Sequence, residues 1–247
     1  MQEYNLGFIS DKDLFYHVKE TTEKYRFKID LKKFNKNLID PIKLTFDSKV
    51  YGKSFREIIE SEIIRQMDKS NTNHIGYFHQ NIFKYIDSDW IVPEQGFDLI
   101  NDKQNIYVEM KNKHNTMNSS SAQKTYIKMQ GKLLDSSECR CMLVEVIAKN
   151  SQNIPWKISI DGVSREHQYI RRVSIDKFYE IVTGKCDAFK VLCQVLPRVL
   201  DDVIKSIEIE TIDDSVLEEL NVISSNPLKS LYMLSFSKYE GFEEFNI

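Results

Sequence analysis

One short alternating segment constrains the fold of this chain more than any other. From Ile106 to Lys111 the side chains alternate with the two-residue period of a β-strand. One face of the predicted strand is apolar and carries Ile106, Val108 and Met110. The other face carries Tyr107, Glu109 and Lys111, so the carboxylate and the ammonium project side by side.

A second strand is predicted just before this one. Residues 97–100 have strand character, and the polar residues 101–104 favour a turn that joins the two strands as a hairpin. This hairpin brings Asp98 opposite Glu109 and so predicts two carboxylates and one ammonium on a single sheet face. Two carboxylate ligands suit Mg²⁺, which keeps several waters and binds substrate phosphate.

These residues resemble a known motif. Asp98, Glu109 and Lys111 match the PD-(D/E)XK nuclease motif, although Phe97 and not proline precedes Asp98. The longer run 107–121 is similar to the type II restriction endonucleases that cut GGNCC or GGWCC sites, the group that includes SinI. The resemblance extends over residues 52–204, with further matches at 76–83 and 182–184.

The resemblance implies an active site. Asp98, Glu109 and Lys111 would be the catalytic residues, with Asp98, Glu109 and the Met110 backbone carbonyl as ligands of Mg²⁺. Glu62 is a further candidate ligand, because it follows Ile58 and Ile59 at helical spacing and so faces inward. Two alternatives stay open: the three residues form a surface salt-bridge cluster, and Glu62 reaches solvent.

Candidate DNA-binding residues form two groups. The first follows the catalytic strand, where polar side chains and a helix start suit phosphate or base contacts: Lys113, His114, Asn115, Asn118 and Ser119. The second is basic and can read guanine through its O6 and N7 atoms: Arg165, Arg171 and Arg172. The alternatives are ordinary loop capping for the first group and a solvated strand face for the second.

The periodicity of the chain predicts an α/β fold. Residues 54–86 read as two helices, capped at Ser54 and broken at 71–73. A hairpin follows, then a helix from Asn118 or Ser119, a strand at 142–147, strands near 157–160 and 169–175, and a helix at 188–204 interrupted at Pro197. This order matches the restriction-endonuclease-like PD-(D/E)XK core, a mixed sheet with flanking helices, with insertions and a helical C-terminal part.

We expect one domain over residues 1–247, with a catalytic core at about 54–150 and with recognition and dimerisation elements at 1–53 and 151–247. The net charge of −3 does not itself indicate DNA binding. However, residues 201–247 hold eleven acidic and three basic residues, so the rest of the chain carries +5. No apolar run is long enough to span a bilayer, and the four cysteines lack the spacing of a zinc site.

The sequence therefore predicts a Mg²⁺-dependent type II restriction endonuclease acting on double-stranded DNA. A palindromic target implies a homodimer in which each subunit cuts one strand. The resemblance further implies a prokaryotic cytoplasmic enzyme, with no membrane contact, paired with a protective DNA methyltransferase. Two other hypotheses stay open: a repair or junction-resolving nuclease on the same core, and a DNA-binding protein without catalysis.

Overall fold

The computed structural model describes residues 3–25, 28–114, 116–208 and 213–236. By contacts, the chain divides into two compact units. The first, here the sheet unit, is Met1–Glu23 with Ile75–Ile207, and the second, here the helical unit, is Lys24–His74 with Glu208–Ile247. The expected single domain over the whole chain stays a prediction.

A mixed five-stranded sheet forms the centre of the sheet unit. Its strands run in the order β2 (Leu99–Asn101), β3 (Ile106–Lys113), β4 (Arg140–Ile147), β8 (Ile170–Ser174) and β5 (Asn153–Pro155). The three central strands are parallel, whereas β2 and β5 pair antiparallel at the two edges. A separate hairpin consists of β6 (Ile158–Ile160) and β7 (Val163–Arg165). The predicted α/β class with a mixed sheet is confirmed.

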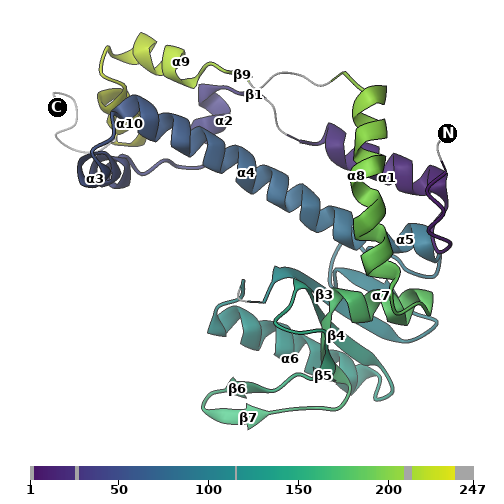
Figure 1. The fold of residues 1–247 in the computed structure, drawn as a ribbon. Helices are drawn as coiled ribbons and strands as arrows, with labels where there is room; N and C mark the ends of the chain where they lie inside the picture. The colour runs from purple at the N-terminus through teal and green to yellow at the C-terminus, as the bar shows by residue number, and fades with distance from the viewer. Residues whose placement is uncertain (1–2, 26–27, 115, 209–212, 237–247) are drawn as a thin grey trace. The chain divides into compact units, whose positions relative to one another are not determined.

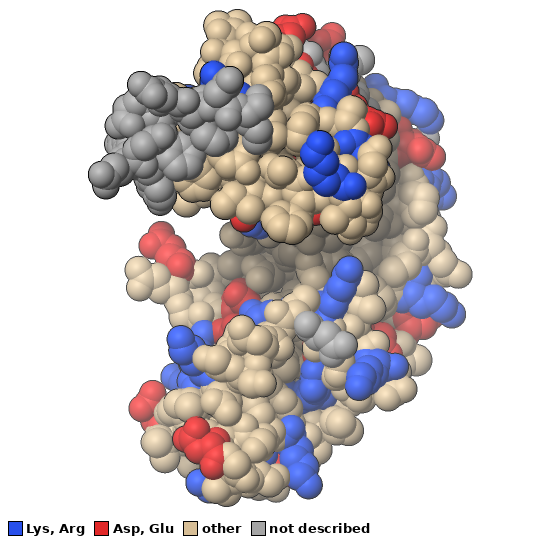
Figure 2. All heavy atoms as spheres, turned by 90° about the vertical axis from the view of Figure 1, so that its left-hand side faces the viewer, with Lys and Arg blue, Asp and Glu red and all other residues tan. Residues whose placement is uncertain are grey.

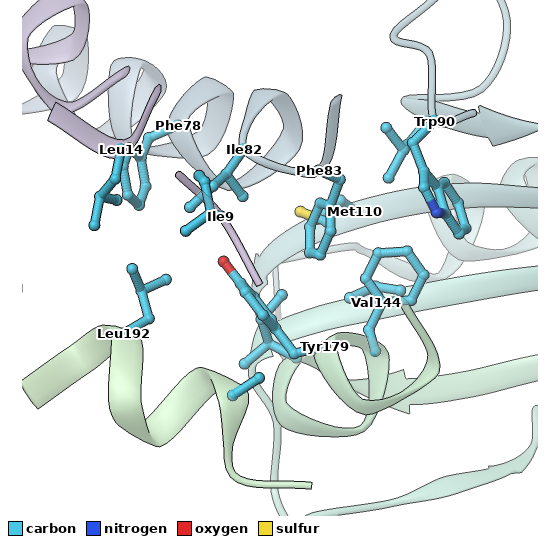
Figure 3. Close-up of a cluster of buried hydrophobic side chains, with 14 of the residues drawn as sticks. Ile9, Leu14, Phe78, Ile82, Phe83, Trp90, Met110, Val144, Tyr179 and Leu192 are labelled. Atoms are coloured by element: carbon cyan, nitrogen blue, oxygen red, sulfur yellow. The ribbon is translucent and has the colours of Figure 1, made fainter. Parts of the chain in front are cut away.

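One face of the sheet is covered by an extensive apolar core. Figure 3 shows side chains of this core, among them Met110 and Val144 from the sheet and Phe83, Trp90 and Tyr179 from the segments that pack on it. The helices of the sheet unit that contribute to this core are α1 (Asp11–Glu23), α5 (Phe83–Ile86), α7 (Ile175–Thr183) and α8 (Ala188–Ser206).

The opposite face of the sheet packs on α6 (Ser119–Asp135). Tyr107 and Leu143 meet the helix residues Tyr126 and Met129 there, together with Trp156. Because α6 connects the parallel strands β3 and β4, the three form a β–α–β unit (Figure 1). Glu109 and Lys111 alternate with Val108 and Met110, so they project on this second face, which α6 covers.

The predicted start of α6 is confirmed. Asn118 has extended backbone angles, and its side-chain oxygen accepts a hydrogen bond from the backbone N–H of Ser121 at 2.8 Å. This is the usual N-cap arrangement, in which a side chain satisfies a backbone donor of the first turn.

Two predicted helix breaks are wrong. Helix α4 runs from Phe55 to Asn81 through the Asn71–Asn73 segment, and α8 continues through Pro197. The low helix propensity of asparagine and threonine costs only a few tenths of a kcal/mol per residue, about 0.7 at most, which the packing of a long helix can offset. In α8, the buried residues Leu192 and Val199 anchor the helix on both sides of the proline.

The helical unit has its own core. It consists of α2 (Leu31–Asn35), α3 (Pro41–Tyr51), most of α4, α9 (Val216–Ile223), α10 (Pro227–Phe236) and a short parallel pair, β1 (Lys28–Ile29) with β9 (Asp213–Asp214). As predicted, Ser54 caps α4: its hydroxyl accepts from the backbone N–H of Glu57, whose carboxylate accepts from Ser54 in return. Within the described ranges, no helix combines the length and apolarity that a bilayer crossing requires.

Candidate active site

The β2–β3 hairpin places the three residues of the predicted motif together. The backbone N–H of Asp98 donates to the Val108 carbonyl at 2.9 Å, and Leu99 pairs with Val108 in the antiparallel register. The Asp98 carboxylate accepts a hydrogen bond of 2.7 Å from the backbone N–H of Met110. The expected hairpin, with Asp98 opposite Glu109, is therefore confirmed, and one carboxylate oxygen of Asp98 is fixed on the backbone of β3.

Lys111 lies between the two carboxylates. Its Nζ is 3.7 Å from Oδ2 of Asp98 and 3.4 Å from Oε2 of Glu109. Glu109 is buried, with 8% of its surface exposed, whereas Asp98 and Lys111 are half-buried. A nearly buried carboxylate is costly unless it is paired or binds a cation, so the ammonium groups around Glu109 account for its position.

A second lysine reaches the same carboxylate from α6. Nζ of Lys128 forms an ion pair with Oε1 of Glu109, donates to the Gly96 carbonyl at 2.7 Å, and lies 4.3 Å from the ring centroid of Phe97. The sequence interpretation missed this residue. Its position depends on how α6 packs over β3, and a single lysine on a helix gives no signal of such a contact.

The arrangement suits a hard cation. Two carboxylates are held close together on one face of the hairpin, where each is paired with a lysine ammonium. Oxygen ligands of this kind match Mg²⁺, which binds through one or two carboxylates and fills its remaining positions with water and phosphate oxygens. The residues present therefore fit the metal that the motif implies.

Glu62 has a different environment. It belongs to the helical unit, and its carboxylate accepts hydrogen bonds from the side chains of Arg65 and Gln66. Burial acts to raise the pKa of Glu62, but these hydrogen bonds outweigh it and hold the pKa below its ordinary value. These bonds give Glu62 a structural role in the helical unit that requires no metal.

A buried carboxylate on β4 adds a cluster that the sequence interpretation also missed. Glu145 pairs in register with Lys111 of β3 and has no exposed surface. Its Oε1 accepts from Nη2 of Arg172, and its Oε2 lies 3.1 Å from Nδ1 of His114. Nη2 of Arg172 also approaches the His114 carbonyl at 3.3 Å. Glu145 thus joins one residue from each predicted DNA-binding group.

His114 and Arg172 border a pocket of about 560 Å³. It lies between the start of α6 and the segment around β6, and its lining combines apolar and polar side chains: His114, Met117, Asn118, Ser119, Ala122, Trp156, Lys157, Ile158, Ser159 and Arg172. Four predicted DNA-binding residues therefore meet around one cavity: His114, Asn118, Ser119 and Arg172.

The other predicted DNA-binding residues lie elsewhere. Arg171 alternates with Arg172 along β8 and so points to the opposite face, where its guanidinium contacts Asn153. Arg165 is exposed on β7, and Lys113 is exposed at the end of β3. Asn115 lies outside the described residues. Strand alternation therefore separates two arginines that their adjacency in sequence had grouped.

Charge alone does not locate a DNA-binding surface. On the face shown in Figure 2, lysine and arginine side chains are interspersed with acidic ones and do not form one continuous basic surface. Phosphate contacts account for much of the affinity of DNA-binding proteins. The positions of individual side chains around the hairpin and the pocket are therefore more informative than the net charge of −3.

Sequence comparison identifies the class. Residues 6–205 match the family model described as the Eco47II restriction endonuclease, and the chain belongs to this family. It is thus a type II restriction endonuclease, an enzyme that hydrolyses double-stranded DNA, and the predicted resemblance and enzyme class are confirmed.

Two curated relatives are similar over most of the chain. The type II restriction enzyme Sau96I of Staphylococcus aureus is 35% identical over 213 residues, which cover 81% of this chain and 82% of the relative. The type II restriction enzyme Eco47II of Escherichia coli is 31% identical over 209 residues, which cover 79% of this chain and 87% of the relative.

Proposed function

We propose that this restriction endonuclease uses Mg²⁺ and the β2–β3 hairpin to hydrolyse phosphodiester bonds within GGNCC or GGWCC sites. The observation that carries the proposal is the cluster of Asp98, Glu109 and Lys111 on one face of one hairpin. The family match covers this whole hairpin. The cluster resembles the PD-(D/E)XK motif, with Phe97 in place of its proline.

Asp98, Glu109 and the Met110 carbonyl would hold the metal. When bound, Mg²⁺ lowers the pKa of a coordinated water and stabilises negative charge on the attacked phosphate. The hydrogen bond from the Met110 N–H keeps one Asp98 oxygen on the edge of β3, so the two carboxylates stay in register without the metal. Such pre-organisation avoids a reorganisation cost during the reaction.

Lys111 would act on the water and the phosphate. Its Nζ is within 3.7 Å of both carboxylates, so it can orient the attacking water or neutralise charge on the phosphate. Because this contact matters most in the transition state, Lys111 should contribute more to rate than to binding.

The pocket beside the hairpin is our candidate for DNA contacts. Arg172 lines this pocket with its Nη2 held by Glu145 and the His114 carbonyl, and its other terminal nitrogen can donate to a guanine acceptor or a phosphate oxygen. His114, Asn118 and Ser119 line the same pocket at the start of α6, where polar side chains suit phosphate or base contacts. Lys113, Asn115, Arg165 and Arg171 are kept as further candidates for contacts with DNA.

A palindromic target implies a homodimer, because each of two identical subunits then cuts one strand. We further propose a prokaryotic cytoplasmic location and a cognate methyltransferase that protects host sites. These proposals follow from the family.

Digestion of a mapped DNA with Mg²⁺ tests the proposal. The variants are Asp98→Asn and Glu109→Gln, which keep shape and remove charge, with Asp102→Asn as the matched control at the turn of the same hairpin. We expect discrete fragments from the wild type and the control, and no cleavage by the two site variants. Sequenced fragment ends should share a GG…CC frame.

Two outcomes would contradict the proposal in different ways. Cleavage by Asp98→Asn or Glu109→Gln at a rate near that of the wild type would show that the hairpin is not the active site. Ends without the GG…CC frame would refute the target and leave the nuclease assignment intact.

A further inference from the structure

The candidate active site on the β2–β3 hairpin, here the hairpin site, has as many positive as negative side chains. Two carboxylates, Asp98 and Glu109, face two ammonium groups, Lys111 and Lys128. A site whose formal charge sums to zero is a weak site for a divalent cation, because each ammonium repels the metal and occupies an oxygen that it needs. Metal binding at Glu109 therefore competes with the ammonium groups that are paired with its carboxylate.

Lys128 is the ammonium that can leave. Lys111 lies between both carboxylates on the central strand β3, whereas Lys128 reaches Glu109 from the neighbouring helix α6. Its side chain is 36% exposed, compared with 29% for Lys111. Lys128 also donates to the Gly96 carbonyl and lies over the face of the Phe97 ring. These contacts can hold its ammonium near the site when a metal replaces it at the Glu109 carboxylate.

We propose that Lys128 is an exchangeable counter-ion of Glu109. In the metal-free enzyme it neutralises this buried carboxylate. When Glu109 holds the metal, the Lys128 ammonium leaves this carboxylate and donates to a phosphate oxygen of the bound DNA. This inference rests on the proposed metal site and adds a residue that acts both on metal affinity and on substrate.

The chemistry supports the second position. A displaced ammonium beside a divalent cation is repelled by it, and the anion that arrives at this site during catalysis is the DNA phosphate. Lysine binds phosphate as a point charge through a long flexible stem, so a movement of its end group needs no change in α6. Helix α6 would thus supply a cation to the reaction without contributing a metal ligand.

Mn²⁺ binding to the DNA-free protein tests the exchange. Free Mn²⁺ is followed by electron paramagnetic resonance during titration of the wild type, of Lys128→Met and of Lys132→Met. Lys132 is the matched control because it lies one turn further on α6 and places its ammonium over the Tyr107 ring at 4.3 Å and not on a carboxylate. Both variants lose one positive charge from the same helix.

We expect Lys128→Met to bind Mn²⁺ about five- to tenfold more tightly than the wild type, because a competitor and a repulsive charge are gone. The control should stay within about twofold, since its ammonium lies over the Tyr107 ring and does not compete for the Glu109 carboxylate. Equal or weaker Mn²⁺ binding by Lys128→Met would overturn the exchange.

Cleavage tests the phosphate contact. At saturating Mg²⁺ and in single turnover, Lys128→Met should cut about 100-fold more slowly than the wild type, the lower end of the ~10²–10³-fold loss that follows removal of one charge-stabilising donor. Lys128→Arg should recover most of the rate. An unchanged rate for Lys128→Met at saturating metal would overturn this half of the inference.

The same titration separates this inference from the proposed function. Asp98→Asn and Glu109→Gln should both weaken Mn²⁺ binding. If they do and Lys128→Met does not tighten it, the metal site stands and the counter-ion role is refuted. If neither weakens Mn²⁺ binding, the metal site itself is refuted.

Discussion

Replacing Glu145 with leucine should strongly destabilise the sheet unit. Glu145 has no exposed surface, and Arg172 and His114 both bond to its carboxylate. In Glu145→Leu the guanidinium of Arg172 loses its anionic partner while only 21% of that side chain is exposed. The Nε of Arg172 is already buried and has no hydrogen-bond partner among the described residues, so little compensation is available.

The magnitude follows from the cost of an unpaired buried charge. Removal of one partner of a buried ion pair costs about 3–5 kcal/mol, and the partial exposure of Arg172 places this case near the lower end, at about 3 kcal/mol. The double variant Glu145→Leu with Arg172→Met removes both charges. It should recover most of this loss, because apolar replacement of a whole buried pair is close to neutral.

Urea unfolding followed by tryptophan fluorescence reports the stability of the sheet unit, which contains Glu145. The chain has two tryptophans, Trp90 and Trp156, and both are buried in the sheet unit. With a slope of about 2 kcal/mol per molar urea, the midpoint for Glu145→Leu should fall by about 1.5 M. A loss of less than about 1 kcal/mol, or a double variant as unstable as the single one, would refute the reasoning.

Three further predictions concern catalysis, pH and specificity. Lys111→Ala should lose cleavage but keep specific DNA affinity in gel shifts with Ca²⁺, because its role lies in the transition state; an equal loss of both would make Lys111 a phosphate contact. Burial and nearby His17 lower the pKa of His79 to about 4. As the pH decreases, the unfolded chain therefore binds a proton at His79 before the folded protein does. This lowers the free energy of unfolding by about 3 kcal/mol between about pH 6.5 and pH 4, and the effect is absent above about pH 6.5. His79→Leu should therefore show a smaller decrease in thermal midpoint between about pH 7 and 4.5 than the wild type, and an equal decrease would contradict this assignment. Arg172→Lys should lower cleavage of cognate sites while metal binding stays unchanged, because lysine lacks the planar two-point donor geometry; cognate cleavage at the wild-type rate would exclude Arg172 from base reading.

The β2–β3 hairpin could be predicted from sequence because its signals are local. Strand alternation from Ile106 to Lys111 and a polar turn determine which side chains share a face, and the register follows from the short loop. The start of α6 was equally local, since Asn118 is a good cap. Such features depend on neighbours a few residues away and not on the tertiary fold.

Lys128 and Glu145 were missed because their contacts are tertiary. Lys128 meets Glu109 only when α6 packs over β3, and no spacing rule connects the two positions. The sequence does indicate a special role for Glu145, because it is the one charged residue in the apolar run 142–147. A carboxylate in a central strand predicts a buried charge with partners. The missed continuity of α4 has the same cause, because packing overrode weak local propensity.

The β3–α6–β4 connection has a consequence for how such enzymes diverge. The two carboxylates and both lysines of the hairpin site lie between Asp98 and Lys128, in one continuous stretch of chain. By contrast, the outer wall of the adjacent pocket comes from the later segment between Trp156 and Arg172. Mutations that alter the shape of this wall can accumulate while the chemical step is inherited intact. If this pocket reads the target, as we propose, a new target preference can evolve, or be selected in a library, by varying the wall alone.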